Sequence, residues 1–148
     1  MKARRSRPIT LKIPARFLSV PYDGSRYPGA IKASDLRDGA NCQRFAFELL
    51  RHFGRTVPNF RSSELWDDAE QTTIAKRLRP LDLLLFSRDG RAWGAHVGVY
   101  LGEGQVIHLA KKVGRPEIWT MADFAADPSY RVFIGAKRVR ASSRVRAR

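Results

Sequence analysis

The chain has 148 residues, of which 43% are hydrophobic, and a formal net charge of +14. This length and composition suit a single globular domain with one core. No run approaches the roughly 20 apolar residues of a membrane-spanning helix, and the lone cysteine, Cys42, excludes an internal disulfide.

The positive charge belongs to the two ends of the chain. Of the 28 basic residues, 13 lie at positions 1–16 and 131–148, which contain no acid, so the remaining 15 nearly balance the 14 acidic residues. We expect 1–16 and 140–148 to be mobile basic segments flanking one domain at 17–139. They are either solubilising tails or weak, nonspecific contacts for polyanions, because they contain no aromatic stacking platform.

A helix is predicted from Cys42, where Phe45, Leu49 and Phe53 recur at helical spacing. Asn41 is a favoured N-cap residue and Gly54 a favoured stop. Cys42 therefore falls in the first turn, where unpaired backbone N–H groups and the helix dipole favour an anion. A lone cysteine is most often a small buried hydrophobe, but this position predicts a lowered thiol pKa and a reactive thiolate.

A second helix is predicted at Ser62 or Ser63, and strands are predicted from Leu83 onward. Residues 95–109 read as a β-hairpin around a Gly-x-Gly turn. A three-residue loop at 101–103 would place His96 directly opposite His108, and a loop at 102–104 would leave them diagonal on the same face. A two- or four-residue loop would separate them.

Two histidines on one face and a cysteine at a helix start supply a nucleophile, a base and a group that orients the base. The same trio could hold zinc, but structural zinc needs four protein ligands, so we rank metal lower and expect no cofactor. His52 lies about 15 Å of helical rise from Cys42 and is excluded.

The remaining pattern adds a short helix near Asp123–Ala125 and a last strand at Tyr130–Ile134. Helices followed by several strands indicate an α+β fold, with an antiparallel sheet packed against the cysteine-bearing helix.

The segment 78–110 resembles the core of the NlpC family of papain-like cysteine peptidases, which cleave bacterial cell-wall peptides as D,L-endopeptidases. The resemblance rests on Pro80-Leu81-Asp82-Leu83, His96-Val97-Gly98-Val99-Tyr100 and Val106-Ile107-His108, and extends from about Pro21 to Val139, most of the chain. It implies a papain-like core in which Cys42 is the nucleophile, His96 the general base and His108 the residue that orients His96.

The resemblance also suggests substrate contacts. Val20-Pro21-Tyr22 is similar to a family motif whose tyrosine touches substrate, and Tyr27 competes for this role. The usual Asp-Cys-Ser-Gly is Asn41-Cys42-Gln43-Arg44 here, so the substrate subsite departs from the family pattern. The candidate substrate-binding residues are Tyr22, Tyr27, Asn41, Gln43 and Trp93.

These features predict a thiolate and imidazolium pair of Cys42 and His96 that hydrolyses an amide bond in a peptide or muropeptide. Alternatives are a non-wall amidase, thioesterase or acyltransferase on the same scaffold, and a non-catalytic polyanion-binding module. The start of the chain lacks an apolar secretory region, so we expect a cytoplasmic protein, unless another route delivers it outside.

Overall fold

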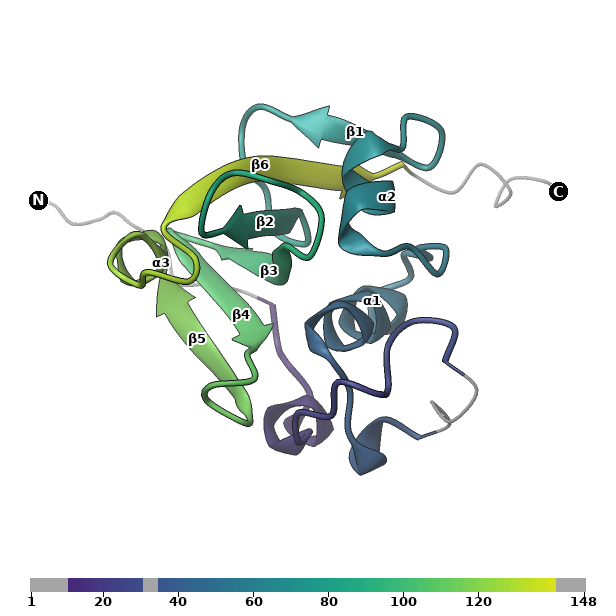
Figure 1. Cartoon of the computed structure of the whole chain (residues 1–148). Coiled ribbons are helices and arrows are strands. Elements are labelled where there is room, and N and C mark those ends of the chain that lie inside the picture. Colours follow the sequence, from purple (N-terminus) through teal and green to yellow (C-terminus); the bar gives the residue numbers. More distant parts are fainter. Residues whose placement is uncertain (1–10, 31–34, 141–148) are drawn as a thin grey trace, which may run out of the picture.

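The computed structural model describes residues 11–30 and 35–140. Within these two ranges, five helical elements and six strands follow one another (Figure 1). The helical elements are η2 (Ala15–Ser19), η3 (Leu36–Asp38), α1 (Cys42–His52), α2 (Ser62–Asp67) and α3 (Met121–Ala125). The strands are β1 (Thr72–Ala75), β2 (Leu83–Ser87), β3 (His96–Gly102), β4 (Gln105–Leu109), β5 (Pro116–Thr120) and β6 (Val132–Val139).

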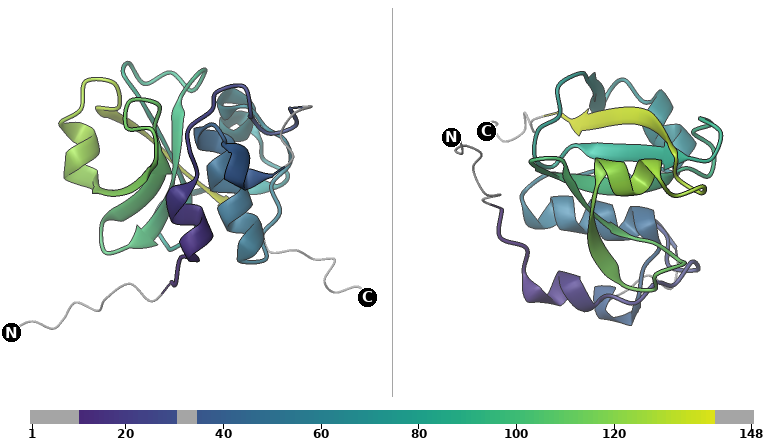
Figure 2. Two further views of the ribbon diagram at one scale, coloured as in Figure 1. Left: turned by 90° about the horizontal axis from the view of Figure 1, so that it is seen from below. Right: turned by 90° about the vertical axis from the view of Figure 1, so that its left-hand side faces the viewer.

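The strands form one antiparallel sheet in the order β1-β6-β2-β3-β4-β5. The long last strand, β6, returns to lie between β1 and β2. Helix α1 packs against β3 and β4, whereas α3 lies on the other side of the sheet (Figure 2, left). The predicted α+β class, with the cysteine-bearing helix on an antiparallel sheet, is confirmed.

Helix α1 begins and ends for local reasons that the sequence already indicates. The Asn41 side chain accepts a hydrogen bond from the Arg44 N–H at 2.8 Å, so Cys42 is the first helical residue. Gly54, at φ +86°, ends the last turn by donating its N–H to the Arg51 carbonyl. His52 is exposed at the far end of α1, beside Arg16, as expected.

Both faces of the sheet are covered, so its central strand β2 is apolar almost throughout. Leu83 and Leu85 join the core under α1, whereas Leu84 and Phe86 join a second core under α3. In that second core, the rings of Phe86 and Phe124 stack at 4.0 Å. Side chains that alternate with Val97 and Val99 on β3 therefore face α3.

The β3–β4 hairpin has a two-residue tip, Glu103 and Gly104, both with positive φ. Such a tip alone would place the two histidines on opposite faces, but the register shifts between Tyr100 and Gly102 and restores the parity. Val99 pairs with Ile107, so His96 and His108 are diagonal neighbours. The predicted direct opposition is wrong, and the diagonal alternative is confirmed.

The basic ends fall mostly outside the described residues, so their predicted behaviour stays a prediction. At the inner edge of the first segment, Leu11 and Ile13 already pack against the core. Within 11–30 and 35–140, no helix has the length and apolarity that crossing a membrane requires.

Candidate active site

Cys42 lies beside the first residues of β3, where that strand is paired on one side only. β2 pairs with β3 from His96 onward, but β4 pairs with it only from Val99. The backbone N–H groups of Val97, Gln43 and Cys42 itself lie around the sulfur. The thiol thus reaches the sheet at the residue that follows His96. In the described part of the chain, it forms no hydrogen bond with either imidazole.

Burial dominates the acidity of this thiol. Although Cys42 as a residue is partly exposed, desolvation of its sulfur raises its pKa to about 11, against the smaller opposing effect of the three N–H groups. The predicted lowering of the thiol pKa is therefore wrong for the unliganded protein. The helix start does favour the thiolate, but burial costs more than the helix start contributes.

His96 and His108 are both buried and directly joined. Nε2 of His96 lies 2.8 Å from Nδ1 of His108. Burial, together with electrostatic interaction with His108 and Lys112, lowers the pKa of His96 well below its usual 6.5. Burial also lowers the pKa of His108 to about 4, outweighing Glu117 and Asp127. Both rings are neutral at pH 7, so the resting site holds a thiol and an imidazole rather than an ion pair.

The hydrogen bond between the imidazoles engages Nε2 of His96 and leaves its Nδ1 outside the bond. Which ring donates depends on the tautomers: when His96 donates its Nε2–H, its Nδ1 can accept a proton and His108 carries its own proton on Nε2. That buried Nε2 has no hydrogen-bond partner in the described ranges. The His108 ring lies against Trp119 at 4.4 Å and Phe124 at 4.7 Å, an aromatic enclosure that keeps water away.

Gly98 provides the space that the diagonal histidine pair needs. It lies between the two histidines on the face toward α3, directly across from His108 in the Val99–Ile107 register. A Cβ built on Gly98 would lie 2.6 Å from Cγ1 of Val106 and 3.3 Å from Cβ of His108. Only glycine therefore fits without displacement of β4.

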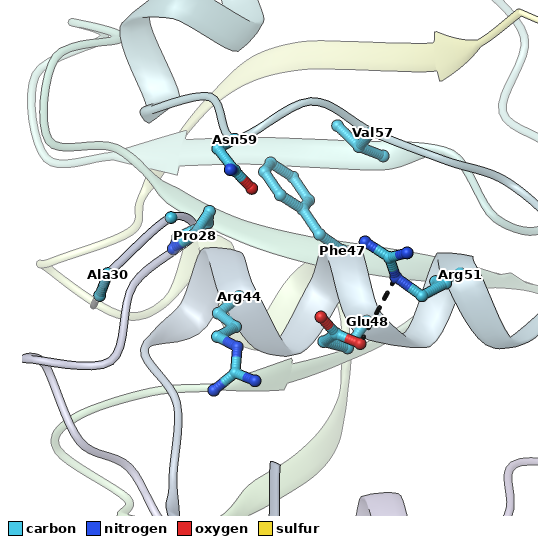
Figure 3. A pocket seen from close by; sticks show the side chains of 9 residues that line it. Pro28, Ala30, Arg44, Phe47, Glu48, Arg51, Val57 and Asn59 are labelled. Atoms are coloured by element: carbon cyan, nitrogen blue, oxygen red, sulfur yellow. Dashed lines mark ion pairs between the residues drawn. The ribbon is translucent and has the colours of Figure 1, made fainter. Parts of the chain in front are cut away.

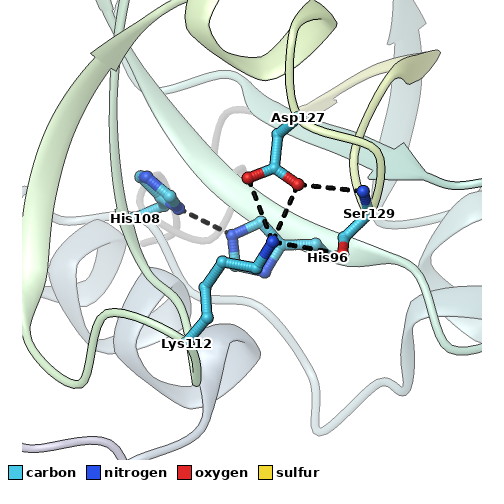
Figure 4. Close-up of polar contacts among 5 residues, drawn as sticks. All are labelled: His96, His108, Lys112, Asp127 and Ser129. Atoms are coloured by element: carbon cyan, nitrogen blue, oxygen red, sulfur yellow. Dashed lines mark hydrogen bonds and ion pairs between the residues drawn. The ribbon is translucent and has the colours of Figure 1, made fainter.

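Lys112, Asp127 and Ser129 form a group of polar contacts beside His96 (Figure 4). Lys112 Nζ lies 2.8 Å and 3.0 Å from the two oxygens of Asp127 and 3.2 Å from Oγ of Ser129. This fixes the segment that leads to Tyr130, whose ring stacks on His96 at 4.5 Å. Burial raises the pKa of Tyr130 to about 12, so it covers His96 as a neutral ring. No motif in the sequence identifies these residues.

Two cavities flank the loop before His96. One, of about 270 Å³, is lined by His96, Phe86 and Tyr130; the other, of about 570 Å³, is lined by Gln43, Arg61 and Ser62. Both include Gly94 and Trp93, a tryptophan that is 82% exposed.

Ser62 fixes the loop between these cavities. Its buried hydroxyl donates to the Ala92 carbonyl at 2.6 Å and accepts from the Ala95 N–H at 3.0 Å. The first turn of α2 is thereby tied to the residues that lead into His96.

The other candidate substrate residues differ in where they lie. Burial raises the pKa of Tyr22, and the next contribution comes from Cys42, so this tyrosine lies near the thiol. Tyr27 instead lies under the guanidinium of Arg61 at 4.4 Å. Gln43 lines the larger cavity, while the side-chain oxygen of Asn41 is occupied as the N-cap.

A third cavity, of about 200 Å³, lies along α1 on the side of Arg44, Phe47 and Arg51 (Figure 3). Its lining includes neither Cys42 nor the two histidines. The described residues also gather no group of three or more His, Cys, Asp or Glu side chains that could hold a metal ion.

The fold and the site together define a papain-like α+β protein. Residues 24–124 match the model of the NlpC/P60 family, and the chain belongs to this family. The comparison with functionally curated proteins gives no match.

Solved structures agree on the fold. An NlpC/P60 family protein from Bacillus cereus is 25% identical, with a TM-score of 0.58 over 83% of this chain and 36% of its own. The NlpC/p60 domain of the peptidoglycan hydrolase SagA is 20% identical, with a TM-score of 0.53 over 85% and 92%. The peptidoglycan hydrolase RipB from Mycobacterium tuberculosis is 16% identical, with a TM-score of 0.54 over 86% and 61%. The chain thus spans about a third of the Bacillus cereus protein.

The pKa of Cys42 can be measured by the pH dependence of its alkylation with iodoacetamide, followed by mass spectrometry. Because the pKa is about 11, the rate should rise with pH about tenfold per unit through neutrality, without a plateau. In denaturant, the same thiol should titrate near the ordinary value of about 8.5. A plateau of the folded protein below pH 7 would instead indicate a thiolate and imidazolium pair.

Gly98→Ala should lower the free energy of unfolding by about 1–3 kcal/mol, since the added methyl group overpacks the hairpin. Val106→Ala removes the Cγ1 atom that is approached most closely, so the double variant should lose less than the sum of the two single losses. Denaturant unfolding of the four proteins measures this coupling. Additive losses would show that the two side chains do not compete for the space.

Proposed function

We propose that this protein is a cysteine hydrolase that cleaves amide bonds in peptidoglycan-derived peptides, with Cys42 as nucleophile, His96 as general base and His108 as the residue that orients His96. Membership of the NlpC/P60 family supports the class of enzyme. SagA and RipB, which share the fold, are described as peptidoglycan hydrolases. The observation that carries the proposal is the buried 2.8 Å contact between His96 and His108. Val97, the residue after His96, donates its backbone N–H to the Cys42 sulfur.

Attack begins from the neutral pair. As the sulfur approaches the carbonyl carbon, its proton passes to Nδ1 of His96, and Nε2–H of His96 remains bound to His108. A high thiol pKa and a low imidazole pKa keep the nucleophile protonated until substrate arrives. Catalytic hydrogen bonds often tighten only in the substrate complex, which is consistent with a thiol that forms no bond to His96 at rest.

The start of α1 is the natural place for the developing oxyanion. The N–H of Arg44 is bound by Asn41, and that of Phe45 by the Asn41 carbonyl. The N–H groups of Cys42 and Gln43 lie at the sulfur instead. In the proposed reaction, they stabilise the carbonyl oxygen as it becomes negative.

The tetrahedral intermediate then collapses. His96 gives its Nδ1 proton to the departing amine, the C–N bond breaks, and a thioester to Cys42 remains. Water, deprotonated by His96, attacks this thioester and releases the carboxylic acid and the thiol. Tyr130 on one side and Trp119 beside His108 keep bulk water away from the ring pair throughout.

In this proposal the substrate lies over the thiol, with one part in each of the two cavities. Trp93 and Gly94 belong to both cavities, with Gln43 on one side and His96 on the other. Tyr22 lies near the thiol and is the better candidate of the two tyrosines for contact with the reacting part of the substrate.

Incubation with defined muropeptides, followed by mass analysis of the products, tests the proposal. Cys42→Ala should lower turnover by at least about a thousandfold, because the nucleophile is lost, while circular dichroism shows an unchanged fold. His96→Ala should lower turnover similarly. Products formed by the Cys42→Ala variant at the normal rate would refute Cys42 as the nucleophile.

A further inference from the structure

Arg61 lines the larger cavity. Gln43, which follows Cys42 in the sequence, lines it too. The guanidinium carbon of Arg61 lies 4.4 Å from the centre of the Tyr27 ring. In residues 11–30 and 35–140, no carboxylate, carbonyl or hydroxyl accepts a hydrogen bond from this guanidinium. The group is therefore held in place by an aromatic face, while its N–H donors are unused.

Stacking of this kind prepares an arginine for a ligand. The ring occupies one face of the planar guanidinium, so its N–H groups, which lie in the plane, still point outward. Less side-chain freedom is then lost when a ligand binds. The planar fork matches the two oxygens of a carboxylate, which it can bind through two parallel hydrogen bonds.

The acidic residue in the same cavity does not neutralise Arg61. The Glu64 carboxylate accepts the backbone N–H of Arg61 at 2.7 Å, at the start of α2. In the described part of the chain, this carboxylate forms no salt bridge with the Arg61 guanidinium. The positive charge of Arg61 therefore remains available to an anion.

We propose that Arg61, held by Tyr27, binds a free carboxylate of the peptide substrate in the cavity beside Gln43. This inference rests on the proposed function, because it places the carboxylate on the molecule whose amide bond Cys42 attacks. Trp93, on the wall of the same cavity, supplies an aromatic surface for the rest of that substrate. The subsite selects peptides that carry a carboxylate near the scissile bond over their neutral amides.

Two peptides that differ in one group test the selectivity: L-alanyl-γ-D-glutamyl-L-lysine, and the same peptide with the glutamyl α-carboxylate converted to a carboxamide. The wild-type protein should favour the carboxylate peptide about tenfold in kcat/KM, as expected for a charged hydrogen bond. Arg61→Gln should remove this preference mainly through KM, and Arg61→Lys should restore part of it. Arg37→Gln, at an exposed arginine of η3 paired with Asp35, is the matched control and should keep the preference.

The stacking partner gives a second variant. Tyr27→Leu should lower the preference because the guanidinium loses its support, and Tyr27→Phe, which keeps the ring, should lower it less. Equal hydrolysis of both peptides by the wild-type protein would overturn the subsite while leaving the hydrolase intact.

Calorimetric binding of the two peptides to Cys42→Ala separates this inference from the proposed function. Tighter binding of the carboxylate peptide, lost in Cys42→Ala combined with Arg61→Gln, supports the subsite even if the wild-type protein cleaves neither peptide. Equal binding of both peptides in that background contradicts it.

Discussion

The hydrogen bond between Nε2 of His96 and Nδ1 of His108 depends on the register of one hairpin. A two-residue tip would place the imidazoles on opposite faces of the sheet, and the shift between Tyr100 and Gly102 brings them back to one face. The pair is then diagonal, and a Cβ on Gly98, which lies between the two histidines, would crowd Val106 and His108. Backbone pairing thus brings the two imidazoles within reach of each other.

The surroundings of this pair decide its charge. Phe124 and Trp119 enclose His108, and Tyr130 covers His96. Burial lowers the pKa of both imidazoles and raises the pKa of the Cys42 thiol. The unliganded site is therefore neutral. In the proposed mechanism, a base and a nucleophile that stay uncharged until substrate binds avoid the cost of a buried ion pair at rest. In that mechanism the charge develops during attack, next to the N–H groups that begin α1.

Local signals in the sequence predict the parts of this arrangement that local geometry controls. Asn41 and Gly54 bound α1. The shared face of His96 and His108 is also predicted, but in the structure it depends on the register shift between Tyr100 and Gly102, which the sequence does not indicate. The high pKa of Cys42 could not be predicted in this way, since desolvation depends on what packs over the sulfur. The edge strands β1 and β5 have short, partly exposed segments with weak alternation, and no strand was expected at either.

Contacts between distant segments escaped prediction for the same physical reason. Lys112 reaches Asp127, and Arg61 stacks on Tyr27 across 34 positions of sequence, with no motif at either residue. These long-range contacts add what the pattern around Cys42 leaves open: an aromatic cover for His96, and a positive charge on the wall of the larger cavity. Gln43, in place of the serine usual in the family, lines the same cavity.

Nitrogen-15 NMR of the two buried imidazoles near pH 7 shows directly which of their nitrogens carry a proton. The proposed mechanism requires that both rings are neutral, that Nδ1 of His96 and Nδ1 of His108 carry no proton, and that the Nε2 proton of His96 is shared with His108. Two protonated nitrogens on His96 in the unliganded protein would contradict the neutral resting pair, and absence of the shared proton would contradict the orienting role of His108.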